Sequence, residues 1–158
     1  MTLVTLLYIR NSSGDFMLIE RNKEPNKGML SPPGGKLEIN SAELPIDCAR
    51  REAFEECSIT TKRCDWTLLG IAAEKEYPKA GNLLMFFYEL NFPVNDLPNE
   101  INEGKFRFVK ENEIFDNLIP DTDRRYFWDM ILKSTGKPFE VRLDCSSAPF
   151  EIAESPVL

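Results

Sequence analysis

Two apolar, β-rich runs near the middle of the chain constrain its fold most strongly. They are "WTLLGIAAEKEY" (66–77) and "LLMFFYELN" (83–91), and the short sequence "PKAGN" joins them. Two such runs separated by a few turn-forming residues are typical of a β-hairpin. The sequence therefore predicts a sheet that contains this hairpin.

Further strand-like segments occur on both sides of the predicted hairpin. The runs at residues 2–10 and 16–22 flank the turn cluster "NSSGD", which predicts a second hairpin. A short strand is expected at 105–109 and a last strand at 138–145, because apolar and polar residues alternate there. Residues 23–38 carry three prolines and three glycines, which predicts a structured loop rather than a helix or a central strand.

A helical pattern follows this loop. It extends from Ser41 to about Cys57, with Asn40 and Ser41 as candidate N-caps and Pro45 in the first turn, where its missing N–H is harmless. Start and stop signals also predict a helix at residues 121–134, and a short helix is expected at 110–118.

The chain has the size and composition of one domain. It has 158 residues, of which 42% are hydrophobic, and it shows no internal repeat. We therefore expect a single α+β domain over residues 1–145, with a mixed sheet between helices, and a C-terminal tail over 146–158. No apolar run approaches the roughly 20 residues of a membrane span, so no membrane partner is expected.

Charge and composition exclude several classes of function. The net charge of −7 disfavours a nucleic-acid polymer as the partner, and a small polyanion would need metal ions to approach the chain. The chain has no histidine, which excludes a Ser-His-Asp triad, a His-ligated zinc site and an imidazole base. Catalysis must rest on carboxylates, Lys, Tyr, Cys or a hard metal ion.

The cysteines and the N-terminus indicate the compartment. The N-terminus has no secretory signal pattern, and no two cysteines form a C-x-x-C pair. These features predict reduced core thiols and a cytoplasmic location. The four cysteines are Cys48, Cys57, Cys64 and Cys145.

Three glutamates in the first predicted helix raise the question of a metal site. In "ARREAFEECS", Glu52, Glu55 and Glu56 are related by i, i+3 and i+4, so their carboxylates project from one face. One interpretation is a solvated face balanced by neighbouring arginines. The other is a magnesium site, since Mg²⁺ is held by a few carboxylates, water and phosphate oxygens. The preceding loop "PPGGK", which ends in Lys36, favours the second, because its glycines permit close backbone approach to phosphate.

The segment "GGKLEINSAELPIDCARREAFEECSI" (34–59) resembles the signature of the Nudix hydrolase superfamily. That signature is a glycine, five residues, a glutamate, seven residues, then Arg-Glu, two residues, Glu-Glu, one residue and a glycine. Gly35 matches its start, and Glu43 with Arg51 and the residues that follow match its end. Seven residues instead of five separate Gly35 from Glu43, and Ser58 replaces a glycine that usually has a left-handed backbone.

The resemblance implies a Nudix α/β/α sandwich that hydrolyses a nucleoside diphosphate linked to another group, with Mg²⁺ or Mn²⁺ as cofactor. It implies that Arg51 holds the glutamates by ion pairing. The general base is left open between Glu52 and a loop acid, either Glu103 or Glu100. The implied metal ligands are the Gly34 carbonyl, Glu52, Glu55 and Glu56, and the implied catalytic residues are Arg51, Glu52, Glu55 and Glu103.

Beyond this motif, residues 2–143 resemble MutT-type enzymes, including purine nucleoside triphosphatases that remove oxidised nucleotides. Ile119 stands where mammalian members carry a tryptophan that stacks on the purine, which leaves the base open. The aromatic residues that are candidates either for stacking or for the core are Phe86, Phe106, Tyr126 and Trp128. The implied substrate contacts are Arg21, Lys23, Gly35, Lys36 and Asp121.

Three activities therefore stay open. The first is cleavage of a nucleoside triphosphate to the monophosphate and pyrophosphate. The second is hydrolysis of another nucleoside diphosphate derivative such as ADP-ribose, and the third is nucleotide sensing without catalysis. The intact glutamates favour an enzyme, whose partner is a small nucleotide and which is a monomer or weak dimer.

Overall fold

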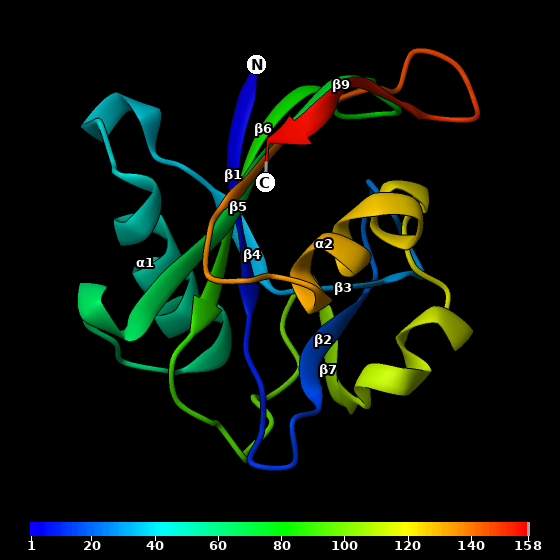
Figure 1. Cartoon of the computed structure of the whole chain (residues 1–158). Coiled ribbons are helices and arrows are strands. Elements are labelled where there is room, and N and C mark those ends of the chain that lie inside the picture. Colours follow the sequence, from blue (N-terminus) through cyan, green and yellow to red (C-terminus); the bar gives the residue numbers. More distant parts are fainter. Residues whose placement is uncertain (158) are drawn as a thin grey trace.

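A six-stranded mixed sheet runs through the middle of the molecule in the order β4-β1-β6-β5-β8-β9 (Figure 1). The β1–β6 and β5–β8 pairs are parallel, and the other neighbours are antiparallel. Its strands are β1 (Thr2–Tyr8), β4 (Gly34–Lys36), β5 (Trp66–Tyr77), β6 (Gly81–Leu90), β8 (Phe139–Asp144) and β9 (Glu151–Val157). The computed structural model describes residues 1–157, with side chains up to residue 153.

A second, three-stranded sheet lies beside the first. Its order is β3 (Leu30–Ser31), β2 (Phe16–Arg21) and β7 (Gly104–Val109), and all of its pairs are antiparallel. The predicted hairpin of β5 and β6 is confirmed, since Trp66 pairs with Leu90 and Tyr77 with Gly81.

The predicted hairpin between residues 2–10 and 16–22 is wrong. β1 and β2 belong to different sheets, and only an isolated bridge between Arg10 and Phe16 joins the two segments. The reason is the burial of both faces of β2. Phe16 and Leu18 pack in one core cluster, whereas Met17 and Ile19 pack in the other. Because alternate side chains of β2 must pack in two different core clusters, β2 pairs with β3 and β7 rather than with β1. The turn residues between β1 and β2 do not predict this choice of partner.

Helix α1 (Pro45–Cys57) packs against β1 and β4 on one side of the large sheet. It begins at Pro45 instead of Ser41, and the predicted N-caps Asn40 and Ser41 are wrong. Residues Ile39–Ser41 form the separate short helix η1, which ends at Ala42 in a left-handed conformation. Pro45 favours this arrangement, because its fixed φ and missing N–H suit the first turn of a helix.

Helical segments also cover the opposite side of the large sheet (Figure 1). The segment expected at 110–118 is the 3₁₀ helix η3 (Glu111–Asp116). A further 3₁₀ turn, η2 (Arg63–Asp65), lies instead beside α1. The helix expected at 121–134 contains a π-helical stretch, η4 (Asp123–Phe127), which continues into α2 (Trp128–Leu132). The predicted mixed sheet between helices is thus confirmed.

Strand β9 lies in the segment expected to be a tail. It pairs antiparallel with β8 at the edge of the large sheet. Pro149 and Pro156 obscure its strand pattern in the sequence. Proline is tolerated at such an edge, because an edge strand leaves some N–H positions unpaired.

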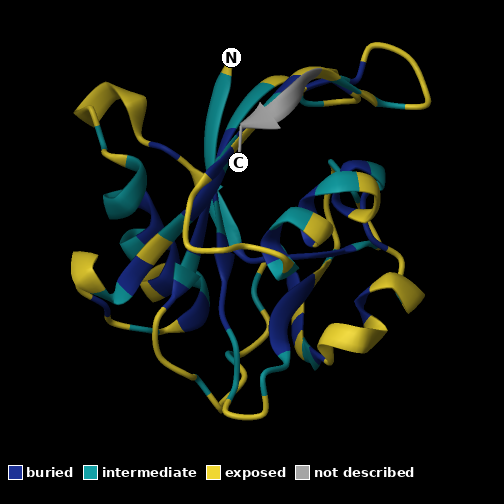
Figure 2. Cartoon of the chain, viewed as in Figure 1, coloured by how far each residue is buried: buried dark blue, intermediate teal, exposed yellow. Residues whose placement is uncertain are grey.

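Buried residues concentrate on the central strands and on the inner faces of the helices (Figure 2). All four cysteines are free thiols, and Cys48, Cys57 and Cys145 are buried as predicted, whereas Cys64 is exposed. Within the described residues, no helix is long and apolar enough to span a membrane.

Candidate active site

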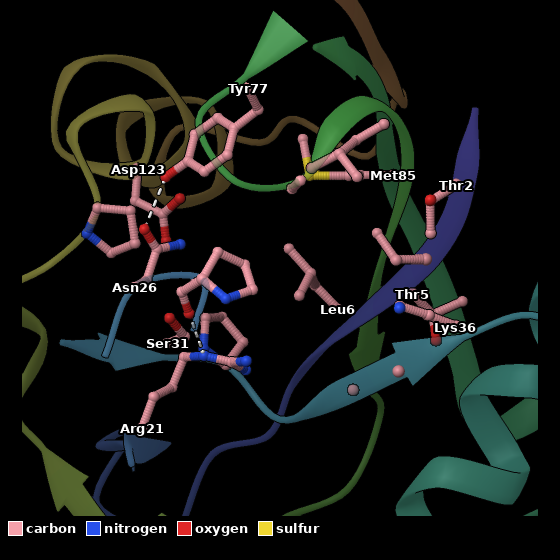
Figure 3. Close-up of a pocket in the computed structure, with 18 of the residues that line it drawn as sticks. Thr2, Thr5, Leu6, Arg21, Asn26, Ser31, Lys36, Tyr77, Met85 and Asp123 are labelled. Carbon is pink, nitrogen blue, oxygen red and sulfur yellow. Dashed lines mark hydrogen bonds between the residues drawn. The ribbon is translucent and has the colours of Figure 1, made fainter. Parts of the chain in front are cut away.

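A cavity of about 580 Å³ opens between the two sheets and the loop that precedes β3. Gly34, Gly35, Glu52 and Glu56 line one end of it. Figure 3 shows Asn26, Tyr77 and Asp123 gathered at another end, away from Lys36. One space therefore joins the glutamate motif of α1 to a polar recess formed by other parts of the chain.

Strand β4 brings backbone groups close to the helix because two of its residues are glycines. Gly34 has a φ of 148°, and a Cβ there would overlap the Thr5 carbonyl oxygen. A Cβ at Gly35 would overlap the carboxylate of Glu52. Both positions therefore require glycine for close approach. As a result, the Gly34 N–H donates a hydrogen bond of 3.0 Å to Glu56 Oε2.

Arg51 holds the acidic residues of the motif together. Its guanidinium donates to both carboxylate oxygens of Glu43, at 2.9 and 3.1 Å. It also donates to Glu52 at 2.6 Å and to Glu55 at 3.1 Å. A further bond of 3.0 Å to the Lys36 carbonyl ties the helix to the end of β4. The planar fork of arginine suits several fixed acceptors, so Arg51 sets the positions of these carboxylates.

Two of the three glutamates have perturbed acidity. The pKa of Glu56 is raised to about 7, chiefly by burial and also by the charges of Glu52 and Glu103, although the Gly34 N–H and Arg21 act against the rise. Burial also raises the pKa of Glu52, against the opposing effect of Arg51. Glu55 is more exposed and is paired with Arg51. Among the described residues, Arg51 forms ion pairs with Glu52 and Glu55 but not with Glu56, so the ionised form of Glu56 is the least compensated of the three.

Comparison with known proteins identifies the family. The sequence model of the NUDIX domain matches residues 2–128, which is most of the chain. The chain belongs to the Nudix family. The family match, together with the MutT-like fold, indicates a Nudix pyrophosphohydrolase.

Solved structures with low identity show the same fold. A mutator MutT protein from Bacillus halodurans is 20% identical, with a TM-score of 0.76 over 98% of this chain and 95% of that chain. A MutT protein from Methanosarcina mazei Go1 is 23% identical, with a TM-score of 0.66 over 84% of this chain and 91% of that chain. The NUDIX domain of Shewanella oneidensis NrtR, crystallised with ADP ribose, is 12% identical, with a TM-score of 0.67 over 84% of this chain and 85% of that chain.

Nudix enzymes generally use divalent metal ions, and the donor groups here fit such an ion. Among the described residues, no three acidic or other ligand side chains are already arranged around one point. Glu52 and Glu55 are instead drawn to Arg51, and Glu56 to the Gly34 N–H. The donors are oxygen atoms, as a hard cation requires. Such a cation would balance the incompletely compensated charge of half-buried Glu56.

Only some of the other residues implied by the resemblance line the Nudix cavity, and Lys23 is not among them. Arg21, Lys36 and Glu103 line it, whereas Glu100 does not. Lys23 forms an ion pair of 3.6 Å with Glu103. Arg21 donates a hydrogen bond of 2.9 Å to the Pro25 carbonyl.

Asp121 and the candidate stacking residues lie outside the cavity lining. The Asp121 carboxylate is paired with Arg125 at 2.8 Å, and its neighbours Thr122 and Asp123 line the cavity instead. Phe106 and Trp128 are buried in the core, and Phe86 and Tyr126 also pack against core clusters. Tyr77 and Phe127 are the aromatic residues that line the cavity.

Sequence reasoning missed the acids at the polar recess. Glu74 and Asp123 are both buried and both line the cavity. Beside them, the Tyr77 hydroxyl donates a hydrogen bond of 2.8 Å to Asn26 (Figure 3). The burial of Glu74 could have been predicted from the sequence, because Glu74 follows the apolar Ala72 by two residues on a strand. Side chains alternate along a strand, so these two lie on the same face. A charged residue on a buried face deserves a functional explanation.

Asp123 should make the stability of this protein depend on pH. Burial raises the pKa of Asp123 to about 8, with a contribution from the charge of Glu74. Burial also raises the pKa of Glu74 to about 7. The hydroxyl-bearing side chains of Tyr77 and Tyr8 also face these acids. The unfolded chain loses the Asp123 proton first as pH rises, so the free energy of unfolding falls between about pH 4 and 8. In Asp123→Asn, we expect this fall to be smaller by about 1–3 kcal/mol. Urea denaturation at pH 5 and pH 8 measures it.

The exposed Asp129 on the same helical segment provides the control for that experiment. Asp129→Asn should keep the pH dependence of the parent protein, because this carboxylate is exposed and paired with Lys133. Equal pH dependence in the parent and Asp123→Asn would show that Asp123 does not carry a raised pKa.

Ser58 confirms the backbone expected at the missing signature glycine. It caps α1 with φ 58° and ψ 30°, which is the left-handed region. A serine there is less stable than a glycine, so Ser58→Gly should raise the free energy of unfolding by about 0.5–1 kcal/mol. Urea denaturation tests this, and turnover should stay unchanged, because Ser58 does not line the cavity. A destabilised Ser58→Gly variant would contradict it.

Proposed function

We propose that this Nudix protein cleaves nucleoside triphosphates to the monophosphate and pyrophosphate in a Mg²⁺-dependent reaction. The observation that supports this best is the continuity of the cavity. Its Gly34–Glu56 end has the donor groups for a metal-bound phosphate chain, and its Tyr77–Asp123 end offers polar groups to a base. A nucleotide has both kinds of group, joined by a sugar.

The proposed metal ligands are the three motif glutamates and one backbone carbonyl: Glu52, Glu55, Glu56 and Gly34. Mg²⁺, or Mn²⁺ in its place, would neutralise phosphate charge and make a bound water more acidic. Arg51 would keep Glu52 and Glu55 in place through the bonds already described. Binding of the ion would also favour the ionised form of Glu56.

The chain's own cationic and acidic groups would complete the site. Lys36 and the Gly35 backbone, which line the cavity, are proposed to meet phosphate oxygens. Arg21, also in the lining, and Lys23, which pairs with Glu103, are the further basic residues proposed for phosphate contact. A carboxylate must accept the proton of the attacking water, because the chain has no histidine. Glu52 and Glu103 are the proposed bases, since both line the cavity.

The proposed setting is a reduced cytoplasm, with the protein acting on a small nucleotide as a monomer or weak dimer. Free thiols at all four cysteines support the compartment. The net charge of −7 supports a small nucleotide rather than a nucleic-acid polymer, because the polymer would add repulsion along its whole length.

A panel assay tests the proposed activity. Phosphate release is measured through inorganic pyrophosphatase for normal and oxidised nucleoside triphosphates, and through alkaline phosphatase for ADP-ribose and dinucleoside polyphosphates, with and without Mg²⁺. We expect Mg²⁺-dependent cleavage of triphosphates that requires the coupling enzyme for phosphate release. Cleavage of ADP-ribose alone would replace the proposed substrate class. Nucleotide binding without any cleavage would instead support a sensing module.

A further inference from the structure

Two buried acids face the same recess of the cavity from different parts of the chain. Glu74 lies on β5 and is 3% exposed, and Asp123 begins η4 and is 8% exposed. Both line the cavity, and Figure 3 shows Asp123 beside Tyr77 and Asn26. Neither belongs to the glutamate motif of α1. The chain therefore places two largely buried carboxyl groups in the wall of the cavity, where a bound ligand could contact them.

One oxygen of this pair has no hydrogen-bond partner. The Thr122 side chain bonds to the carboxyl of Glu74, but Glu74 Oε1 is buried and has no partner within the described structure. None of the ion pairs found among the described residues includes Glu74 or Asp123. A buried acceptor without a donor is costly, so it calls for a specific explanation. A bound ligand that supplies N–H donors would provide one.

We propose that Glu74 and Asp123 select a guanine base by accepting hydrogen bonds from its ring N–H and its neighbouring amino group. This inference rests on the proposed function, because it assigns the base of the same nucleotide. Glu74 is then a specificity-determining residue that touches the base and takes no part in bond cleavage.

The hydrogen-bonding groups on the edges of the bases favour guanine over adenine and cytosine. A carboxyl oxygen that carries no proton accepts hydrogen bonds, and two adjacent N–H donors would stabilise the ionised form of a buried acid, which can accept both at once. Guanine presents two adjacent donors, the ring N1–H and the 2-amino group. In adenine and cytosine the amino group adjoins a ring nitrogen acceptor, which would face the carboxylate lone pairs. Guanine oxidised at C8 keeps the same two donors, so the inference covers both forms.

A comparison of two substrates tests this without any mutation. ITP differs from GTP only by the absence of the 2-amino group. Since a hydrogen bond to a charged group gives roughly a tenfold to 100-fold preference, we expect kcat/KM for GTP to exceed that for ITP by this factor. ATP should be poorer than GTP by at least as much. Equal kcat/KM for GTP and ITP would overturn the inference.

The variant Glu74→Gln then assigns the preference to its residue. It keeps the shape of the side chain but presents an amide, so the GTP/ITP ratio should fall to within about threefold of unity. Glu76→Gln is the matched control, because Glu76 is an exposed acid on the same strand that does not line the cavity. That control should keep the parent ratio, and thermal melting checks that both variants fold. An unchanged ratio in folded Glu74→Gln would overturn the inference.

Failure of the proposed function would be recognised separately. If no triphosphate is cleaved with Mg²⁺, the activity is wrong, and base selection is then measured by calorimetric binding of GMP and IMP to the full chain. Tighter binding of GMP, by about tenfold or more and lost in Glu74→Gln, would still support guanine selection. Equal binding of GMP and IMP would overturn it.

Discussion

Glu56→Gln is expected to lower kcat/KM for nucleoside triphosphates by about 100- to 1,000-fold, because electrostatic stabilisation of the reacting phosphates is lost. In this Nudix site, Glu56 has a half-buried carboxylate that accepts a hydrogen bond from the Gly34 N–H. The amide cannot supply the negative charge that a divalent cation needs. Single-turnover and steady-state rates over a series of Mg²⁺ concentrations measure the effect.

The same change should leave the fold intact. Burial disfavours the ionised form of Glu56, so its neutral amide counterpart should be at least as stable in metal-free buffer at pH 8. The thermal melting curve tests this, and Glu76→Gln serves again as an exposed Glu-to-Gln control with parent turnover. Near-normal turnover in a folded Glu56→Gln protein would contradict the assignment of Glu56 to the metal site.

Arg51→Gln is expected to damage both stability and turnover. It removes the charge that holds Glu43, Glu52 and Glu55, and leaves the largely buried Glu43 carboxylate without its bidentate partner. Because Arg51 is 23% exposed, solvent screens part of the loss, and we expect a decrease of about 1–3 kcal/mol in the free energy of unfolding. Turnover should fall by about 100-fold as the glutamates lose their fixed positions. Urea denaturation and kcat measure the two effects.

Two further variants serve as comparisons for Arg51→Gln. Arg51→Lys restores the charge but not the planar fork, so it should recover part of the stability and less of the turnover. Arg63→Gln removes another arginine, whose pair with Asp47 lies on the surface, and should change neither. Parent-like stability and turnover in Arg51→Gln would show that this network does not organise the site.

The glutamate end of the site was predictable from the sequence because its geometry is local. Helical spacing alone places Glu52, Glu55 and Glu56 on one face. The flanking glycines predicted close backbone approach to phosphate, and in the structure the Gly34 N–H approaches the Glu56 carboxylate. These features depend on residues within about 25 positions of one another, so tertiary structure could not easily displace them.

The base end was not predictable, because it depends on pairing between distant segments. Glu74 and Asp123 meet only when β5 and the start of η4 are brought together, and no local pattern fixes that contact. Asp121 was the expected acid, but the structure turns it toward Arg125 and Asp123 toward the cavity. A π-helical stretch begins at Asp123 and changes which side chains share a face, so α-helical spacing does not apply there. The pairing of β2 with β3 and β7, and that of the edge strand β9 with β8, also join segments that local sequence patterns do not link, so neither was predicted.

The most direct test of the proposed activity is ³¹P nuclear magnetic resonance of GTP incubated with the protein. We expect GMP and pyrophosphate to appear together and in equal amounts, only when Mg²⁺ is added, with no GDP and no free phosphate. Appearance of GDP with free phosphate would contradict cleavage between the α and β phosphates. GTP that binds but stays intact at every Mg²⁺ and Mn²⁺ concentration would contradict a catalytic role for the α1 glutamates.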